Sequence, residues 1–217
     1  MTTRPRTDQP GPLVALGVPL AAAFVLFGLL FRGVVFDFWW QMALSVAGLC
    51  ASGWILHPRM FGGMFRPQER SPFAPITLGL LSAGFLYGTF YAGNLILRRF
   101  SDAAGHQITS VYGFRHGASP WLIAVLLLAV IGPGEEIFWR GYLQRGLTRR
   151  YSAGGLAAAM GAYTLVHAAA GNPVLLLAAL VCGAFWGYLY WRFNSIWLNI
   201  VSHAAWDLAV FALWPLM

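Results

Sequence analysis

Long apolar stretches separated by short polar connections make up most of this sequence. A helix that crosses a bilayer needs about 20 mostly apolar residues at a rise of about 1.5 Å each. The stretches are continuous, whereas transmembrane strands alternate apolar and polar positions. The pattern therefore predicts an all-α, polytopic transmembrane helical bundle of about seven spans. The predicted spans are residues 13–31, 34–56, 73–97, 121–144, 153–170, 173–192 and 195–216.

The ends and connections of these stretches predict one domain. Residues 1–12 are polar and Pro-rich, which is typical of a disordered tail, and residues 13–217 form a single transmembrane domain without an internal repeat. The apolar run 13–31 is too long for the apolar region of a signal peptide, so we expect a retained helix. The turn at 171–173 is so short that spans five and six must be antiparallel neighbours.

Composition excludes most classes of soluble protein. The chain is 59% hydrophobic and 10% charged, with a mean hydropathy of +0.64, whereas about a quarter of the residues in ordinary globular chains are charged. Its two cysteines, Cys50 and Cys182, lie inside apolar runs, where a free thiol behaves as a small hydrophobe. A soluble enzyme, a disordered chain and a disulfide scaffold are therefore excluded.

The positive charge fits loops beside a membrane. All fourteen cationic residues are Arg, and apart from Arg140 they fall singly or in pairs between the apolar stretches, so we expect no nucleic-acid partner. Nine lie in the N-terminal tail, at 57–72, at 145–152 and at Arg192, against four in the opposite connections. This excess predicts a cytoplasmic N-terminus. The all-Arg, Ala/Gly/Leu-rich usage favours a GC-rich bacterial genome and hence a bacterial inner membrane.

Span four carries three ionisable residues, and such residues at membrane depth mark functional sites by default. Glu136 and Arg140 are four residues apart, so they share a helix face and can form an ion pair. Glu135 points about 100° away and lacks that partner, which makes it a candidate general base. The Gly-Pro-Gly at 132–134 can kink the helix just before it.

Spans five and seven each add a histidine. Tyr163 lies one turn before His167, on the same face of span five. In span seven, His203 and Asp207 are four apart, and Asn199 precedes them by one turn on the same stripe. Asp207 can fix the tautomer of His203, as carboxylates do for catalytic or metal-bound imidazoles.

Depth along the helices predicts that these groups share one site. Counted from the predicted cytoplasmic helix ends, Glu135 and His203 lie about 12 Å inside, Asp207 about 18 Å and His167 about 17 to 21 Å. We therefore expect one catalytic cavity built from spans four, five and seven and opening toward the cytoplasm.

Two chemistries suit such a cavity, and both activate water. A Glu base can deprotonate a water that attacks a peptide carbonyl, with His and Asp side chains stabilising the oxyanion and no cofactor required. Alternatively, Glu135, His167 and His203 can hold a divalent metal such as zinc. The sequence has no HExxH motif and no Cys ligand set, so zinc is possible without being compelled.

Three motifs in this order resemble the CPBP superfamily, the CAAX-protease and bacteriocin-processing (Abi) membrane endopeptidases. That family has EExxxR, then an aromatic residue four before a His, then HxxxN or HxxxD. Here EEIFWRGYLQ begins at Glu135, YTLVH ends at His167 and HAAWD begins at His203. The chain departs from the pattern at Tyr163, where Phe is usual, and at Asp207, where eukaryotic-type enzymes carry Asn.

The resemblance implies an intramembrane endopeptidase that hydrolyses membrane-anchored proteins or peptides near their C-termini. Glu135 would activate water together with His167. Since prenylated CAAX proteins are not expected in a bacterium, a bacterial protease acting on other membrane-anchored peptides or C-terminal tails is favoured. The implied catalytic residues are Glu135, His167, His203 and Asp207, and the implied supporting residues are Glu136, Arg140, Tyr163 and Asn199.

Two alternatives stay open from the residues alone. One is a non-catalytic immunity or scaffold protein of the same family, which would keep the polar cluster for packing. The other is a proton-coupled transporter, but the sequence shows no inverted repeat or paired broken helices. In the enzyme interpretation the partners are a membrane-anchored substrate and the lipid bilayer.

Overall fold

The structure is a computed structural model that describes residues 12–33, 36–66 and 73–216, and within these ranges it is helical and contains no strand. The tail predicted at the N-terminus lies outside the described residues apart from Pro12. The α-helices are α1 (Leu13–Phe31), α2 (Phe38–Leu56), α3 (Ala74–Phe100), α4 (Asp102–Tyr112), α5 (Pro120–Leu126), α6 (Gly132–Glu135), α7 (Arg145–Tyr151), α8 (Ala153–Val166), α9 (Pro173–Phe193) and α10 (Ile196–Leu208). Short π-helical segments cover Leu127–Ile131, Glu136–Gln144 and Ala209–Leu213, and 3-10 turns cover Pro58–Met60, Gly113–Arg115 and His167–Ala170.

A helix occupies each of the seven predicted spans. In the described part of the chain, six helical stretches are long and apolar enough to cross a membrane: Leu13–Phe31, Ala74–Phe100, Pro120–Tyr151, Ala153–Ala170, Pro173–Phe193 and Ile196–Leu213. The helix α2, which contains 19 residues, is outside this set. The all-α polytopic bundle is confirmed, and the count of seven spans stays a prediction.

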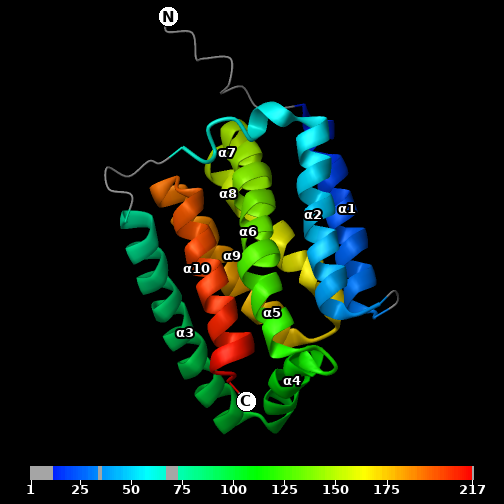
Figure 1. Ribbon diagram of the computed structural model, residues 1–217, viewed down its shortest axis with the longest axis vertical. Helices are drawn as coiled ribbons and strands as arrows, with labels where there is room; N and C mark the ends of the chain where they lie inside the picture. The colour runs from blue at the N-terminus through cyan, green and yellow to red at the C-terminus, as the bar shows by residue number, and fades with distance from the viewer. Residues whose placement is uncertain (1–11, 34–35, 67–72, 217) are drawn as a thin grey trace, which may run out of the picture.

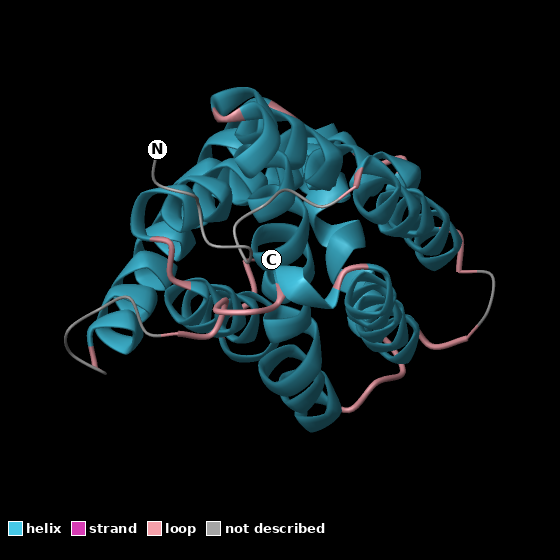
Figure 2. Ribbon diagram, turned by 90° about the horizontal axis from the view of Figure 1, so that it is seen from above, coloured by secondary structure: helices cyan, strands magenta, loops and turns pink. Residues whose placement is uncertain are grey.

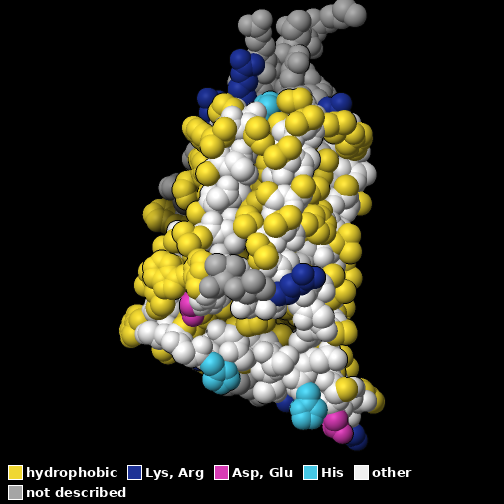
Figure 3. Space-filling model, turned by 90° about the vertical axis from the view of Figure 1, so that its right-hand side faces the viewer, with side chains coloured by type: hydrophobic (Ala, Val, Ile, Leu, Met, Phe, Trp, Pro, Cys, Tyr) yellow, Lys and Arg dark blue, Asp and Glu magenta, His cyan; other side chains and the backbone are white. Residues whose placement is uncertain are grey.

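The stretch from α5 to α7 is the central helix of the bundle (Figure 1). In its most apolar window 56% of the residues are buried, against 11% for α3, which lies at one edge. Seen from above, the helices pack side by side and loops join their ends (Figure 2). The face over α1 and α2 is largely apolar across its middle, with charged and His side chains toward its two ends (Figure 3). Such a belt suits contact with lipid.

The central helix is longer than predicted and is not regular. It continues to Tyr151, so most of the predicted 145–152 connection is helical. Two π-helical segments flank Gly132–Glu135, as often happens at functional sites. A Cβ at Gly134 would lie 2.4 Å from the Cγ1 atom of Val46 on α2. Gly134 therefore lets the central helix pack closely against its neighbour.

The helix α4 closes the end of the bundle at which α1 ends and α9 begins (Figure 1). The sequence predicts only a connection at 98–120, but Ser101 caps this helix by accepting a hydrogen bond of 3.1 Å from the Ala104 amide. The turn between α8 and α9 holds α4 in place. Asn172 Nδ2 donates to the Gln107 carbonyl at 3.0 Å, and the Val174 amide donates to Gln107 Oε1 at 3.2 Å.

Candidate active site

The carboxylate of Glu136 is the centre of a buried polar network, which we call the Glu136 network: Glu136, Arg140, Asn199 and His203. Glu136 Oε1 accepts hydrogen bonds from Arg140 Nη1 at 2.8 Å and from His203 Nδ1 at 2.7 Å. Asn199 Nδ2 donates to the other oxygen, Oε2, at 2.9 Å. All four side chains are buried. The carboxylate is thus compensated by three donors, one of which is the cation Arg140, as a buried charge requires.

Arg140 forms the ion pair with Glu136 that the four-residue spacing predicts. Besides the ion pair with Glu136, its guanidinium lies over the ring of Tyr163, 4.6 Å from the ring centroid, and 5.5 Å from that of Trp186. Its Nη2 donates to the Cys182 carbonyl at 3.5 Å. Arg140 therefore ties the central helix to α8 and α9, and the planar guanidinium suits these stacked contacts.

Glu135 has a different environment from its neighbour in sequence. It is 3% exposed, and its Oε2 atom has no hydrogen-bond partner among the described residues. A buried carboxyl oxygen without a partner is rare in folded proteins and calls for a functional explanation. The predicted division between a paired Glu136 and an unpaired Glu135 is present in the structure.

His167 lies at the end of α8 with one ring nitrogen engaged. Its Nδ1 lies 2.8 Å from the Tyr163 carbonyl, and since a carbonyl only accepts, Nδ1 carries the proton. No described residue makes a hydrogen bond to Nε2, so this nitrogen keeps a lone pair for an incoming donor. The ring packs beside Phe27 and Phe31, with centroids 5.4 and 5.7 Å away. This packing fixes the orientation of the imidazole.

Trp186 and Ser202 position His203, and sequence reasoning missed both. The indole of Trp186 stacks on the imidazole with ring centroids 3.7 Å apart and an interplanar angle of 22°. Trp186 Nε1 donates to Ser202 Oγ at 3.1 Å, and Ser202 in turn is 2.9 Å from Ser82 Oγ on α3. Asp207 Oδ2 lies 3.5 Å from His203 Nε2, a longer contact than that of Glu136. The nearer carboxylate partner of His203 is therefore Glu136.

One cavity of about 120 Å³ brings together the four predicted catalytic residues. We call it the polar cavity, and its polar lining residues are Glu135, Tyr163, His167, His203 and Asp207. Glu136, Arg140 and Asn199 do not line it and lie behind its wall. His203 is the residue that belongs to both the cavity and the Glu136 network. The arrangement thus separates groups that can meet a substrate from groups that hold them in place.

The lining of the polar cavity extends toward one end of the bundle. Its wall includes Phe31, Phe114 and Leu175, which lie at the end of the bundle closed by α4 (Figure 1). These residues lie away from the arginine-rich end toward which the sequence predicts an opening. The expected depth of Glu135 takes Leu143 as a helix end, whereas the helix continues to Tyr151.

The arrangement of donor atoms does not suit a metal site formed by Glu135, His167 and His203. No group of three His, Cys, Asp or Glu side chains within the described ranges is arranged to hold a metal ion. Both ring nitrogens of His203 face carboxylates, Nδ1 that of Glu136 and Nε2 that of Asp207. Glu136 therefore occupies Nδ1 of this imidazole, and only Nε2, beside Asp207, can face an occupant of the cavity.

These features define a class of protein: an integral membrane protein with a buried carboxylate–imidazole site inside a helical bundle. Residues 117–209 match the family described as "Type II CAAX prenyl endopeptidase Rce1-like". This segment is thus similar to CAAX-type intramembrane proteases, and the match supports assigning the chain to the CPBP family. The match runs from just before α5 to just after α10, so α1, α2 and α3 lie outside it. A search of curated proteins and a search of solved structures gave no significant match.

Proposed function

We propose that this chain is an intramembrane endopeptidase that hydrolyses peptide bonds of membrane-anchored proteins or peptides near their C-termini, using water activated by Glu135 and His167. One observation carries the proposal. A buried carboxyl oxygen of Glu135 without a partner lies in the same cavity as the unengaged Nε2 of His167. A water molecule between them would satisfy both groups, because buried waters bind where polar partners are left over.

In this mechanism a water donates one hydrogen bond to His167 Nε2 and the other to Glu135. The Glu135 carboxylate takes a proton as the water oxygen attacks the peptide carbonyl carbon, and a C–O bond forms. We assign the oxyanion to the Nε2 side of His203, whose contact of 3.5 Å with Asp207 is long enough to be exchanged for the substrate oxygen. The tetrahedral intermediate then collapses, the C–N bond breaks, and Glu135 returns its proton to the leaving amine. Water and peptide bond are consumed, and a carboxylic acid and an amine are formed.

The Glu136 network supports this chemistry without taking part in it. Glu136 holds the Nδ1 side of His203, and Trp186 fixes the plane of that ring. Groups held by packing and hydrogen bonds keep the geometry that catalysis needs. Asp207 faces Nε2 of the same ring and biases its orientation from the other side.

The test is cleavage of a membrane-tethered peptide by the purified protein in detergent or proteoliposomes. The wild-type chain should release a C-terminal fragment, and Glu135→Gln should remove this activity while the protein still folds. A chelator arm tests the metal-assisted alternative, and we expect activity to persist in it. Cleavage that continues in Glu135→Gln would refute the assigned base. If the wild type binds the peptide and never cleaves it, the non-catalytic alternative is correct.

We further propose that the membrane is a bacterial inner membrane with the N-terminus in the cytoplasm, so that the polar cavity lies toward the external face. The distribution of arginines supports this orientation. His116 is exposed beside the cavity end, and Ser152 is exposed at the other end. In intact cells a membrane-impermeant maleimide should label His116→Cys and spare Ser152→Cys, with the wild-type chain as control for its own thiols. The reverse pattern would overturn the orientation.

A further inference from the structure

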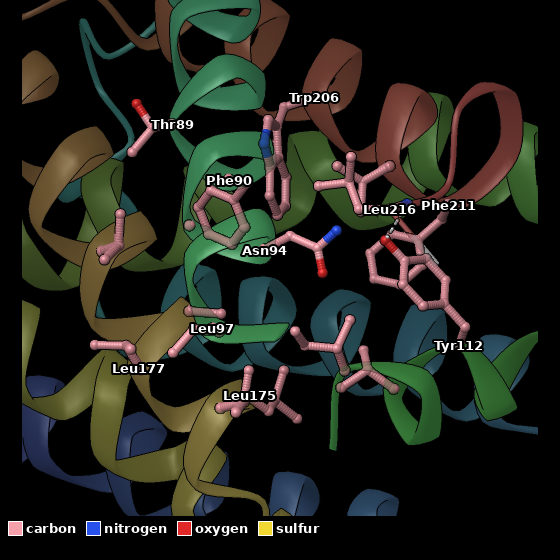
Figure 4. A pocket seen from close by; sticks show the side chains of 17 residues that line it. Thr89, Phe90, Asn94, Leu97, Tyr112, Leu175, Leu177, Trp206, Phe211 and Leu216 are labelled. Carbon is pink, nitrogen blue, oxygen red and sulfur yellow. Dashed lines mark hydrogen bonds between the residues drawn. The ribbon is translucent and has the colours of Figure 1, made fainter. Parts of the chain in front are cut away.

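A second cavity of about 240 Å³ lies between α3, α4, α9 and the end of α10, and we call it the apolar cavity. Its lining is dominated by aliphatic and aromatic side chains such as Phe90, Leu97 and Leu177 (Figure 4). Cavities with apolar walls stay dry and bind apolar molecules. The site is therefore suited to a hydrocarbon chain.

The apolar cavity reaches the lipid-facing surface of the bundle. Thr89 on α3 and Leu177 on α9 both line it and both are exposed, Leu177 by 47%. The two helices touch through the stacked rings of Phe85 and Phe185, whose centroids are 6.1 Å apart. The exposed lining residues Thr89 and Leu177 mark where the cavity meets the surface of the bundle. A chain already in the bilayer can enter there without crossing water.

The apolar cavity and the polar cavity share a wall. Five residues line both: Val111, Leu175, Ala178, Trp206 and Phe211. A molecule whose chain fills the apolar cavity therefore has its other end next to the groups around Glu135. This continuity favours a substrate over a bilayer lipid as the occupant.

Two hydrogen-bond donors on the wall have no acceptor. Asn94 Oδ1 accepts from Arg98 Nε at 2.8 Å, but Asn94 Nδ2 has no partner in the described part of the chain, and Figure 4 shows it inside the ring of lining residues. Trp206 Nε1 is buried and also lacks a partner within those residues. Asn94 is partly buried and Trp206 is buried, and unpaired donors on an apolar wall favour a ligand that brings acceptor oxygens. A carbonyl next to a hydrocarbon chain supplies them, whereas a plain thioether-linked chain does not.

We propose that the apolar cavity binds the fatty-acyl chain of an acylated peptide substrate, with the carbonyl of the acyl link accepting a hydrogen bond from Asn94. This rests on the proposed function, since it assigns the substrate class of the same protease. The walls from α3 and α4 lie outside the family segment 117–209. The other walls, from α9 and Trp206, lie inside that segment, so the acyl site joins the N-terminal helices to the motif helices.

Two glycines on α3 provide a matched test. Gly93 lines the apolar cavity and Gly88 does not, and a Cβ at either meets no atom within 4 Å. Both Gly→Leu changes favour the helix, so neither is expected to unfold it. Only Gly93→Leu places a side chain in the cavity.

The experiment compares one peptide in three forms: palmitoylated through an amide, alkylated through a thioether with the same chain length, and without lipid. For each variant, kcat/KM for the acylated peptide is divided by kcat/KM for the lipid-free peptide. Gly93→Leu should lower this ratio by about tenfold, because about two CH₂ groups of the acyl chain are then left unburied. Gly88→Leu should keep the wild-type ratio. Asn94→Leu should lower the preference for the acyl over the thioether form. An unchanged ratio in Gly93→Leu would overturn the proposal.

Binding separates this proposal from the proposed function. The Glu135→Gln protein should retain the radiolabelled palmitoyl peptide, and the added Gly93→Leu change should weaken that binding by a similar factor. If no peptide is cleaved by the wild type yet binding depends on Gly93, the acyl site stands and the protease assignment fails. If excess phospholipid displaces the peptide and Gly93→Leu only removes copurified phospholipid, the occupant is a bilayer lipid and the substrate assignment is wrong.

Discussion

Glu135 and Glu136 are consecutive and almost completely buried, yet the regions around them differ. Glu136 makes three hydrogen bonds within a packed network and does not line the polar cavity. Glu135 lines the cavity and has an oxygen without a partner among the described residues. In the first region, hydrogen bonds satisfy the Glu136 carboxylate and keep it from reacting with a substrate. In the second region, the Glu135 carboxyl group is free to react. Adjacent carboxylates on one helix can thus have separate roles, structural and chemical.

The largest expected effect concerns stability and comes from the Glu136 side. Arg140→Met removes the cation and leaves the Glu136 carboxylate buried without it. Breaking a buried ion pair in this way costs about 3–5 kcal/mol, so thermal unfolding in detergent should begin at a much lower temperature. Arg192→Gln, at the exposed end of α9, is the control and should melt like the wild type. Equal melting of both variants would show that the Glu136 network does not hold the bundle.

The next effect is on activity and comes from the cavity side. His167→Phe keeps a ring between Phe27 and Phe31 and removes the two nitrogens. Losing a group that handles the proton of water should lower kcat by about 10²- to 10⁴-fold, with little change in KM or melting temperature. Peptide hydrolysis under saturating substrate measures this. If His167→Phe instead lowers the melting temperature and leaves kcat unchanged, the role of His167 is structural.

The smallest effect tests the link between the regions. Ser202→Ala removes the acceptor of Trp186 Nε1 and should lower stability by about 1 kcal/mol, with a few-fold loss of kcat as the ring over His203 loosens. Ser82→Ala alters the same chain of hydrogen bonds from α3. The double variant should therefore be less destabilised than the sum of the two single variants. Full additivity would mean that α3 does not act on Trp186.

Spacing along single helices predicted much of this site. The four-residue separation of Glu136 and Arg140, and the offset of Glu135, follow from helix geometry alone, and the structure has the corresponding ion pair. The shared cavity followed from similar depths. Local periodicity suffices for the ion pair and for the offset of Glu135, because those residues lie within one or two turns of each other.

Contacts between helices were beyond the sequence. Trp186 is one of ten tryptophans, and its stacking on His203 depends on how α9 meets α10. The π-helical winding of Glu136–Gln144 and the helix α4 arise from tertiary packing and capping that override the apolar pattern. The depth expected for Glu135 is affected in the same way, because the central helix continues past Leu143 to Tyr151. Residues 1–11, 34–35 and 67–72 lie outside the described structure, so the predictions for the tail and for the start of span two stay predictions.

The most direct test of the central claim is a side-by-side measurement of Glu135→Gln and Glu136→Gln, each by peptide cleavage and by thermal unfolding. Both changes are isosteric and neighbouring, so they differ only in surroundings. The account predicts that Glu135→Gln loses cleavage by about 10²-fold or more and melts like the wild type, whereas Glu136→Gln melts at a clearly lower temperature. Two variants with the same melting temperature and the same residual cleavage would contradict it.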